Sequence, residues 1–167
     1  MIERFYPNEY IDSVYELDIN KFKKKGISAF VFDIDNTLAP FFVKIPDGRV
    51  RRFFERLKKN GMSVGILSNN KRKRVDIFCR ELNVIYEYKA GKPGLRGLKK
   101  MLKRLETKPS SAALIGDQIF TDIWCANRLG MYSVLVKPIC KKDQFVTWLK
   151  RGIEGYVINA YVKETSK

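Results

Sequence analysis

Polar side chains follow several short apolar runs in this sequence, and their types suit the transfer of a phosphoryl group. Asp33 and Asp35 stand two residues apart at the end of one run, and Asp117 and Asp122 follow another. A carboxylate can attack phosphorus and become an aspartyl phosphate. A second carboxylic acid can protonate the leaving oxygen and then take a proton from the attacking water. Asp33 therefore fits the role of nucleophile, and Asp35 fits that of general acid/base.

Chemistry on a phosphate also needs positive charge, because two carboxylates alone would repel the anionic substrate. Mg²⁺ binds carboxylate, carbonyl and water oxygens and bridges to phosphate. Lys92 offers a fixed positive charge, and Ser68 can donate a hydrogen bond to a phosphoryl oxygen. The sequence contains no histidine, which excludes Ser-His-Asp triads, phosphohistidine chemistry and His-ligated metal sites. Mg²⁺ is therefore the expected cofactor.

Each of these features, taken singly, is also typical of a purely structural role. Acidic residues after strands often cap turns or helices, Thr37 could be a plain cap, and residues 68–70 read equally well as a turn. Lys92 is one of many lysines. The functional interpretation depends on the combination, because these residues fall where one strand after another is expected to end.

The strands and helices that must position these residues alternate along the chain. Apolar runs that predict strands lie at 29–33, 62–67, 84–88, 112–116 and 132–136. Apolar residues recur at helical spacing in 47–60, 71–82, 94–105 and 119–129. Continuous apolar strands suit a sheet covered on both faces, and alternation with helices favours parallel pairing. The expected fold is α/β, with a mostly parallel five-stranded sheet flanked by helices and the polar side chains at its carboxyl edge.

The length and composition fit one domain. The chain has 167 residues, of which 45% are hydrophobic, enough for a core at this size. We expect residues 27–140 to form the core, 1–26 a helical N-terminal extension packed on it, and 141–167 a helical C-terminal segment. The sequence shows neither the pattern of a signal peptide nor an apolar stretch approaching ~18 residues. The three cysteines form no CxxC pair, and the expected location is the cytoplasm.

In this order the polar positions resemble the four motifs of the haloacid dehalogenase-like (HAD) superfamily. Its DxDxT motif matches residues 33–37, its GDxxxxD motif matches residues 116–122, and its Ser/Thr and Lys motifs match Ser68 and Lys92. The resemblance covers about residues 29–122 and implies a Rossmann-like fold with phosphatase activity.

The resemblance also implies a role for each position. Asp33 would attack phosphorus and bind Mg²⁺, and Asp35 would act as acid/base and lend its backbone carbonyl to the metal. Thr37 would orient their loop. Asp117 would bind Mg²⁺ directly. Asp122 would support the metal site by contacting its ligands, or would bind the metal through a water molecule.

The detailed sequence in and around these motifs, at residues 7–10, 32–40, 68–70 and 116–122, resembles the YqeG branch of class IIIA HAD phosphatases. This branch is similar to phosphatidylglycerophosphate phosphatases of mitochondria and plastids, which implies a lipid phosphate substrate. The motif spacing leaves no room for a cap domain, which HAD enzymes of small metabolites usually carry. A capless, open site suits a substrate whose bulk stays outside, such as a lipid in a membrane, a protein or a nucleic acid.

The charge of the chain points to an anionic partner, because 33 basic and 18 acidic residues give a net charge of +15. Basic residues gather near the expected site, at 71–74, Lys89, Lys92, Lys137, Lys141 and Lys142. We expect Asn69 and Arg74 to contact the substrate. We also expect the basic cluster and the aromatic N-terminal segment to hold the protein peripherally on the inner leaflet of an anionic membrane. The alternative is a soluble basic surface with no lipid role.

Two other interpretations stay open. The same chemistry could act on a protein, nucleotide or polynucleotide phosphate, or the chain could be a basic nucleic-acid- or ribosome-associated binding protein with a vestigial site. The intact motif set argues against a vestigial site. Because the sequence has neither a basic-aromatic signature of the RRM type nor a Gly-rich loop, no nucleic-acid partner is expected. The oligomeric state is left open.

Overall fold

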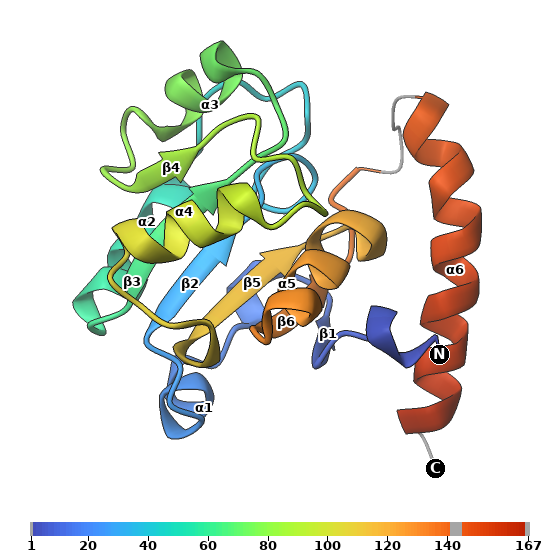
Figure 1. Ribbon diagram of the computed structural model, residues 1–167. Coiled ribbons are helices and arrows are strands. Elements are labelled where there is room, and N and C mark those ends of the chain that lie inside the picture. The colour runs from blue at the N-terminus through green and yellow to red at the C-terminus, as the bar shows by residue number, and fades with distance from the viewer. Residues whose placement is uncertain (1, 141–144, 166–167) are drawn as a thin grey trace.

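The computed structural model describes residues 2–140 and 145–165. Within 145–165, the side chains of residues 152 and 154–165 are described. The described residues form one six-stranded sheet in the order β1-β6-β5-β2-β3-β4 (Figure 1). The strands are β1 (Glu9–Ile11), β2 (Ala29–Phe32), β3 (Ser63–Leu67), β4 (Ile85–Glu87), β5 (Ala112–Gly116) and β6 (Tyr132–Val136). All neighbouring pairs are parallel, so the carboxyl ends of the strands meet at one edge of the sheet.

The five strands predicted from apolar runs are all present, which confirms the α/β class and the parallel sheet. The predicted number was one short, because the N-terminal segment supplies β1, which pairs with β6. Residues 2–26 are therefore not one helical extension. They hold 3₁₀ turns at Glu3–Phe5 and Val14–Glu16, strand β1, and the short helix α1 (Ile19–Lys24). A strand of three residues is too short to show an alternating pattern, and its partner lies far along the chain.

The helices fall inside the predicted ranges. Those between the strands are α2 (Gly48–Lys59), α3 (Arg72–Cys79), α4 (Arg96–Arg104) and α5 (Trp124–Leu129). A π-helix at Ile119–Ile123 precedes α5, and α6 (Phe145–Thr165) follows the sheet. Asp47 caps the N-terminus of α2, because its carboxylate accepts a hydrogen bond of 2.8 Å from the Val50 N–H. Of the predicted C-terminal segment, residues 141–144 and 166–167 lie outside the described residues.

Alternate strand residues face opposite layers of helices, as a period of two requires. Phe30 and Phe32 of β2 belong to a core cluster with residues of α1, α2 and α3, such as Phe22, Phe54 and Phe78. Ala29 and Val31 belong to a second cluster with α4 and α5. The sheet is thus buried on both faces, which explains why its strands read as continuous apolar runs.

A third cluster joins the N-terminal segment to α5 and α6. The Phe5 ring lies edge-on to Phe120 and Trp124, at centroid distances of 5.2 and 5.4 Å. Tyr6 lies edge-on to Tyr161 of α6 at 5.6 Å, and the two segments run side by side in Figure 1. The aromatic residues near the start of the chain are therefore engaged in packing inside the molecule.

No cap domain interrupts the core, as predicted. The stretch between Asp33 and Ser68, described throughout, contains a loop, α2 and β3, and that between Ser68 and Lys92 contains α3 and β4. Among the described residues, none of the helices is long and apolar enough to cross a membrane.

Candidate active site

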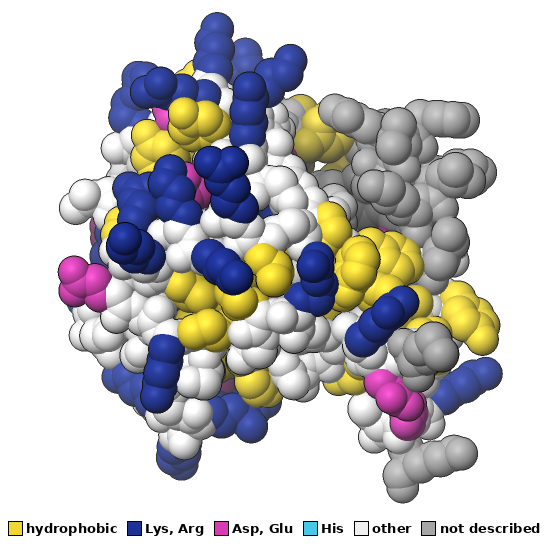
Figure 2. Space-filling model, in the orientation of Figure 1, with side chains coloured by type: hydrophobic (Ala, Val, Ile, Leu, Met, Phe, Trp, Pro, Cys, Tyr) yellow, Lys and Arg dark blue, Asp and Glu magenta, His cyan; other side chains and the backbone are white. Residues whose placement is uncertain are grey.

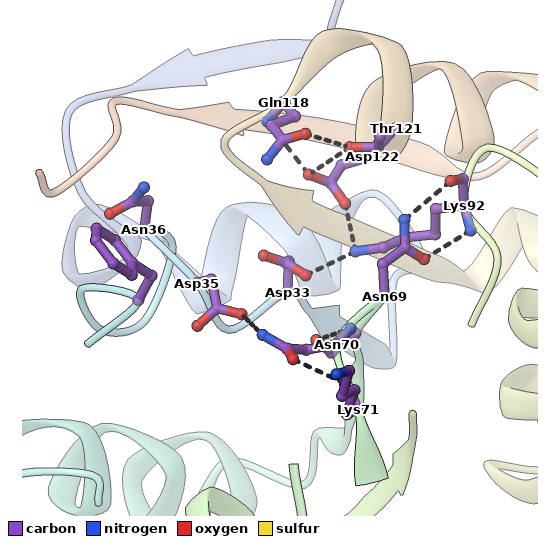
Figure 3. A pocket seen from close by; sticks show the side chains of 12 residues that line it. Asp33, Asp35, Asn36, Asn69, Asn70, Lys71, Lys92, Gln118, Thr121 and Asp122 are labelled. Carbon is purple, nitrogen blue, oxygen red and sulfur yellow. Dashed lines mark hydrogen bonds and ion pairs between the residues drawn. The ribbon is translucent and has the colours of Figure 1, made fainter. Parts of the chain in front are cut away.

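A cavity of about 680 Å³ opens at the carboxyl edge of the sheet, where β2, β3 and β5 end (Figure 3). The predicted site residues that line it are Asp33, Asp35, Ser68, Asn69, Lys92 and Asp122. Thr37 and Asp117 are buried beside it, and Arg74 is mostly buried on α3. The parallel sheet thus brings together residues that lie far apart in the sequence.

Lys92 occupies the centre of the site. Its ammonium lies 2.7 Å from Asp33 Oδ1 and 2.5 Å from Asp122 Oδ1 (Figure 3). It also donates to the Leu67 carbonyl at 2.9 Å. The Lys92 side chain is only 2% exposed, so its charge depends on these partners. Burial opposes the charged form, but the carboxylates of Asp122 and Asp33 outweigh it and raise the pKa of Lys92. Lys92 therefore stays protonated and holds two carboxylates together.

Three buried carboxylates form a candidate cation site. Oxygens of Asp33, Asp117 and Asp122 all lie within 4.8 Å of one another. Burial raises the pKa of Asp33 to about 7, against the attraction of Lys92. A divalent cation at this carboxylate would favour its charged form. A set of oxygen ligands without nitrogen or sulfur suits Mg²⁺, so the residues present fit the predicted metal.

The close approach of Asp122 to the end of β5 depends on Gly116. A Cβ atom at position 116 would lie 2.2 Å from the carboxylate carbon of Asp122, a distance that no real contact allows. The second oxygen of the same carboxylate accepts hydrogen bonds from the Gln118 N–H at 3.2 Å and the Thr121 hydroxyl at 3.4 Å. The turn after β5 is therefore built around one buried carboxylate.

Asp35 points toward α3 and the loop after β3. Its Oδ2 accepts from the Asn70 amide at 3.0 Å, and its Oδ1 accepts from Arg74 Nη2 at 2.9 Å and Nε at 3.3 Å. Arg74 also donates to the Lys44 carbonyl at 3.3 Å. Arg74, which the sequence indicated as a substrate contact, thus holds the predicted acid/base in this structure.

The loop after β3 is tied to the Lys92 segment. The Asn69 amide donates to the Lys92 carbonyl at 2.9 Å and accepts from the Lys92 N–H at 2.8 Å. Ser68 Oγ accepts from the Asn70 N–H at 3.1 Å, which leaves its hydroxyl hydrogen able to point at a ligand in the cavity. Asn69 fixes the backbone that carries Lys92, while Ser68 faces the cavity.

The loop after β2 turns sharply at Asn36, which follows the two predicted catalytic carboxylates and precedes Thr37. Asn36 has a left-handed φ of 63°, which asparagine tolerates better than most residues. Its N–H bonds the Ala39 carbonyl at 2.7 Å, and its carbonyl accepts from the Ile139 N–H at 3.0 Å. The Thr37 hydroxyl is buried and has no hydrogen-bond partner among the described residues. Thr37 bonds the loop through its backbone, since its N–H donates to Ile34 at 3.2 Å.

Five residues of the site were not identified from the sequence. Asn36, Phe41, Gln118 and Thr121 line the cavity, and Asn70 holds Asp35. Gln118 and Thr121 lie inside the last motif and could have been considered on that ground. Nothing in the sequence distinguished Asn70 from its neighbour Asn69, or Phe41 from Phe42.

Comparison with known proteins agrees with this geometry. A family model described as haloacid dehalogenase-like hydrolase matches residues 2–136. The probable phosphatase YqeG of Bacillus subtilis (strain 168) is 31% identical over 161 residues, which cover 96% of this chain and 94% of that protein.

Two further relatives are larger proteins. A glyceraldehyde 3-phosphate phosphatase of Pyrococcus furiosus is 29% identical over 141 residues, with 79% of this chain and 58% of that protein covered. The chloroplastic/mitochondrial phosphatidylglycerophosphate phosphatase 1 of Arabidopsis thaliana is 26% identical over 176 residues, with 96% of this chain covered. The present chain spans 49% of that relative. The chain therefore belongs to the haloacid dehalogenase-like hydrolase family, and it is a phosphatase of that family.

Proposed function

We propose that this protein hydrolyses phosphate monoesters through an aspartyl phosphate formed on Asp33, with Mg²⁺ as its cofactor. The observation that carries the proposal is the buried Asp33–Lys92 pair, 2.7 Å apart, which lines an open cavity at the carboxyl edge of the sheet. Lys92 holds the Asp33 carboxylate in place and supplies positive charge where the phosphoryl oxygens would lie.

In the first step an Asp33 carboxylate oxygen bonds to phosphorus as the bond from phosphorus to the leaving oxygen breaks. Asp35, which lines the same cavity, gives its proton to that oxygen, so the alcohol leaves neutral. In the second step water attacks phosphorus, Asp35 takes a proton from it, and the bond to Asp33 breaks. Inorganic phosphate leaves, and both carboxyl groups return to their starting states.

Asp33, Asp117 and Asp122 are the side chains that would hold the cation, with the Asp35 backbone carbonyl as a further ligand. Bound there, Mg²⁺ would neutralise charge on the phosphoryl oxygens. Ser68 and Lys92 would contact those oxygens from the β3 side of the cavity, and Asn69 would position both.

For the substrate we propose phosphatidylglycerophosphate. Two observations support it: the described residues include no cap domain over the cavity, and one relative bears the name of a phosphatase for that lipid. A small soluble substrate is the second candidate, because another relative is named for glyceraldehyde 3-phosphate.

The experiment measures phosphate release with Mg²⁺ from three substrates: phosphatidylglycerophosphate in mixed micelles, glycerol 3-phosphate and glyceraldehyde 3-phosphate. Faster turnover of the lipid supports the first candidate, and faster turnover of either soluble phosphate removes it. Asp33→Asn should lower p-nitrophenyl phosphate turnover by about 10³-fold or more while circular dichroism stays unchanged. Asp12→Asn, at an exposed position, is the control. Near-normal activity of Asp33→Asn would refute the covalent mechanism.

A further inference from the structure

Large apolar side chains are exposed beside the cavity. Phe42 is 62% exposed, Ile45 53% and Ile139 51%. Phe42 and Ile45 belong to the loop after β2, and Ile139 to the loop after β6. Because both strands run parallel, both loops lie at the carboxyl edge of the sheet, where the cavity opens.

Two contacts tie the loops that carry Phe42 and Ile139 to residues lining the cavity. The Phe42 ring lies edge-on to Phe41 at 5.3 Å, and Phe41 lines the cavity. The Ile139 N–H donates to the carbonyl of Asn36, another lining residue, at 3.0 Å. The core buries none of these three side chains, which lie on two loops at the same edge of the sheet as the cavity, and we call them the apolar rim of the cavity.

Exposed lysines accompany the apolar rim. Lys44 lies between Phe42 and Ile45 in the sequence, and its carbonyl is bonded to Arg74, next to Lys73 on α3. Lys and Arg side chains gather over α3 and β4 in Figure 2. Some basic residues that the sequence indicated are engaged elsewhere, since Arg74 pairs with Asp35, Arg72 with Asp76 and Lys137 with Asp12. Lys44, on the loop after β2, and Lys73, on α3, are exposed and make none of these ion pairs. The same holds for Lys71, which lines the cavity.

The predicted lipid contact of the N-terminal aromatic residues has a competing role in the structure. Phe5 and Tyr6, half-buried, pack against α5 and α6. The apolar side chains that are exposed near the site belong to the loops after β2 and β6 instead.

We propose that this rim (Phe42, Lys44, Ile45, Lys73 and Ile139) docks on an anionic lipid bilayer and presents the cavity to its surface. The three apolar side chains would enter the boundary between headgroups and acyl chains, and the two lysines would lie against lipid phosphates. A nucleic acid would attract the lysines but offers no apolar phase to the isoleucines. The inference rests on the proposed lipid phosphate substrate, for which it names the docking surface.

The test is cosedimentation with vesicles, without substrate. The wild type should bind phosphatidylglycerol/phosphatidylcholine vesicles more tightly than pure phosphatidylcholine vesicles. Phe42→Ser combined with Ile45→Ser and Ile139→Ser should lower the affinity for the anionic vesicles by about tenfold or more. The matched control is Tyr156→Ser with Val162→Ser, which removes exposed apolar side chains from α6 and should leave the affinity within about twofold.

Charge is tested in the same assay. Lys44→Glu with Lys73→Glu should weaken binding to the anionic vesicles at low salt, where exposed charges act most strongly. Lys99→Glu with Lys103→Glu, on the exposed face of α4, makes the same change of net charge away from the rim and should weaken it less. Equal loss from both pairs, or unchanged binding of the apolar triple variant, would overturn the docking surface.

Catalysis is measured separately on p-nitrophenyl phosphate, which needs no membrane. The rim variants should turn over this substrate at the wild-type rate. Inactivity of the wild type on every phosphate, with vesicle binding retained, would refute the proposed function alone. Normal turnover of the soluble ester with no vesicle binding would refute the docking surface alone.

Discussion

The guanidinium of Arg74 lies 2.9 Å from Asp35 Oδ1, although the two residues are 39 positions apart in the chain. Asn70 holds the other oxygen of the same carboxylate. The predicted acid/base is therefore oriented by two side chains from the segment that follows β3. Because Arg74 also bonds the Lys44 carbonyl, it links α3 to the loop that carries Asp35.

Arg74→Ala should impair the step that needs a proton. We expect turnover of an alkyl phosphate to fall by about 10–100-fold, because a misplaced acid protonates the leaving oxygen poorly. Turnover of p-nitrophenyl phosphate, whose leaving group needs little protonation, should fall less. Kinetics on both substrates check this, with Arg72→Ala as the control, since Arg72 pairs with Asp76 at the surface. An equal loss on both substrates would mean that Arg74 has only a structural role.

Removal of the metal should abolish turnover reversibly. Chelation by EDTA leaves the carboxylates of Asp33, Asp117 and Asp122 without their expected cation. Asp117→Asn should raise the Mg²⁺ concentration needed for half-maximal activity by about tenfold or more. Mg²⁺ should also raise the melting temperature of the wild type and do so less in this variant. Full activity after exhaustive chelation would contradict the cation site.

Gly116→Ala should disturb the site although it replaces no charged residue. The new methyl would lie 2.2 Å from the Asp122 carboxylate carbon, so Asp122 or β5 must shift. We expect a loss of about 1–3 kcal/mol in the free energy of unfolding, measured with urea, together with lower phosphatase activity. Gly152→Ala on α6, where nothing lies within 4 Å of the added atom, should be neutral or stabilising. Equal effects of the two changes would argue against the close approach.

Glu87, at the end of β4, should make stability depend on pH. Its carboxylate accepts from Lys100 at 2.8 Å and Arg104 at 2.6 Å. Burial alone would raise the pKa of Glu87, but these two partners outweigh it and hold the pKa below the ordinary 4.5. The stabilisation is therefore present above pH 4.5 and is lost as the pH falls through the lowered pKa of the folded state.

Glu87→Gln should lower the free energy of unfolding by about 1–2 kcal/mol at pH 7, because both partners are partly exposed and screened by water. The difference from the wild type should shrink when urea unfolding is repeated below pH 4. Glu81→Gln, which breaks the exposed pair with Arg51, should cost less than about 1 kcal/mol at either pH. A difference for Glu87→Gln that grows on acidification would contradict the direction of the pKa shift.

The central strands and the gathering of carboxylates at their ends could be predicted because their causes are local. Ala29–Phe32 and Ala112–Gly116 are apolar because both faces of the sheet are covered, and this shows in a window of five residues. The carboxylates that follow them must then meet at one edge, so the juxtaposition of Asp33 and Asp122 follows from parallel strands.

The features that were missed depend on contacts that no local pattern carries. Glu9–Ile11 becomes a strand only because Val134–Val136 offers it an edge. The sequence predicts one basic patch at 71–74, yet Arg74 turns inward to Asp35 while Lys73 stays exposed. Which member of a charged run finds a buried partner depends on the phase of the helix against a loop elsewhere in the chain.

The pairing of β1 with β6 also has a consequence for biosynthesis. The ribosome releases the β1 residues long before their partners, because the hydrogen-bonded residues Asn8 and Ser133 are 125 positions apart. Until β6 emerges, the first strand has no neighbour, and the Phe5 ring lacks the Phe120 and Trp124 rings on which it packs. A nascent chain that ends before β6 therefore carries unpaired strand residues and uncovered aromatic side chains. Exposed surface of this kind binds chaperones and promotes aggregation.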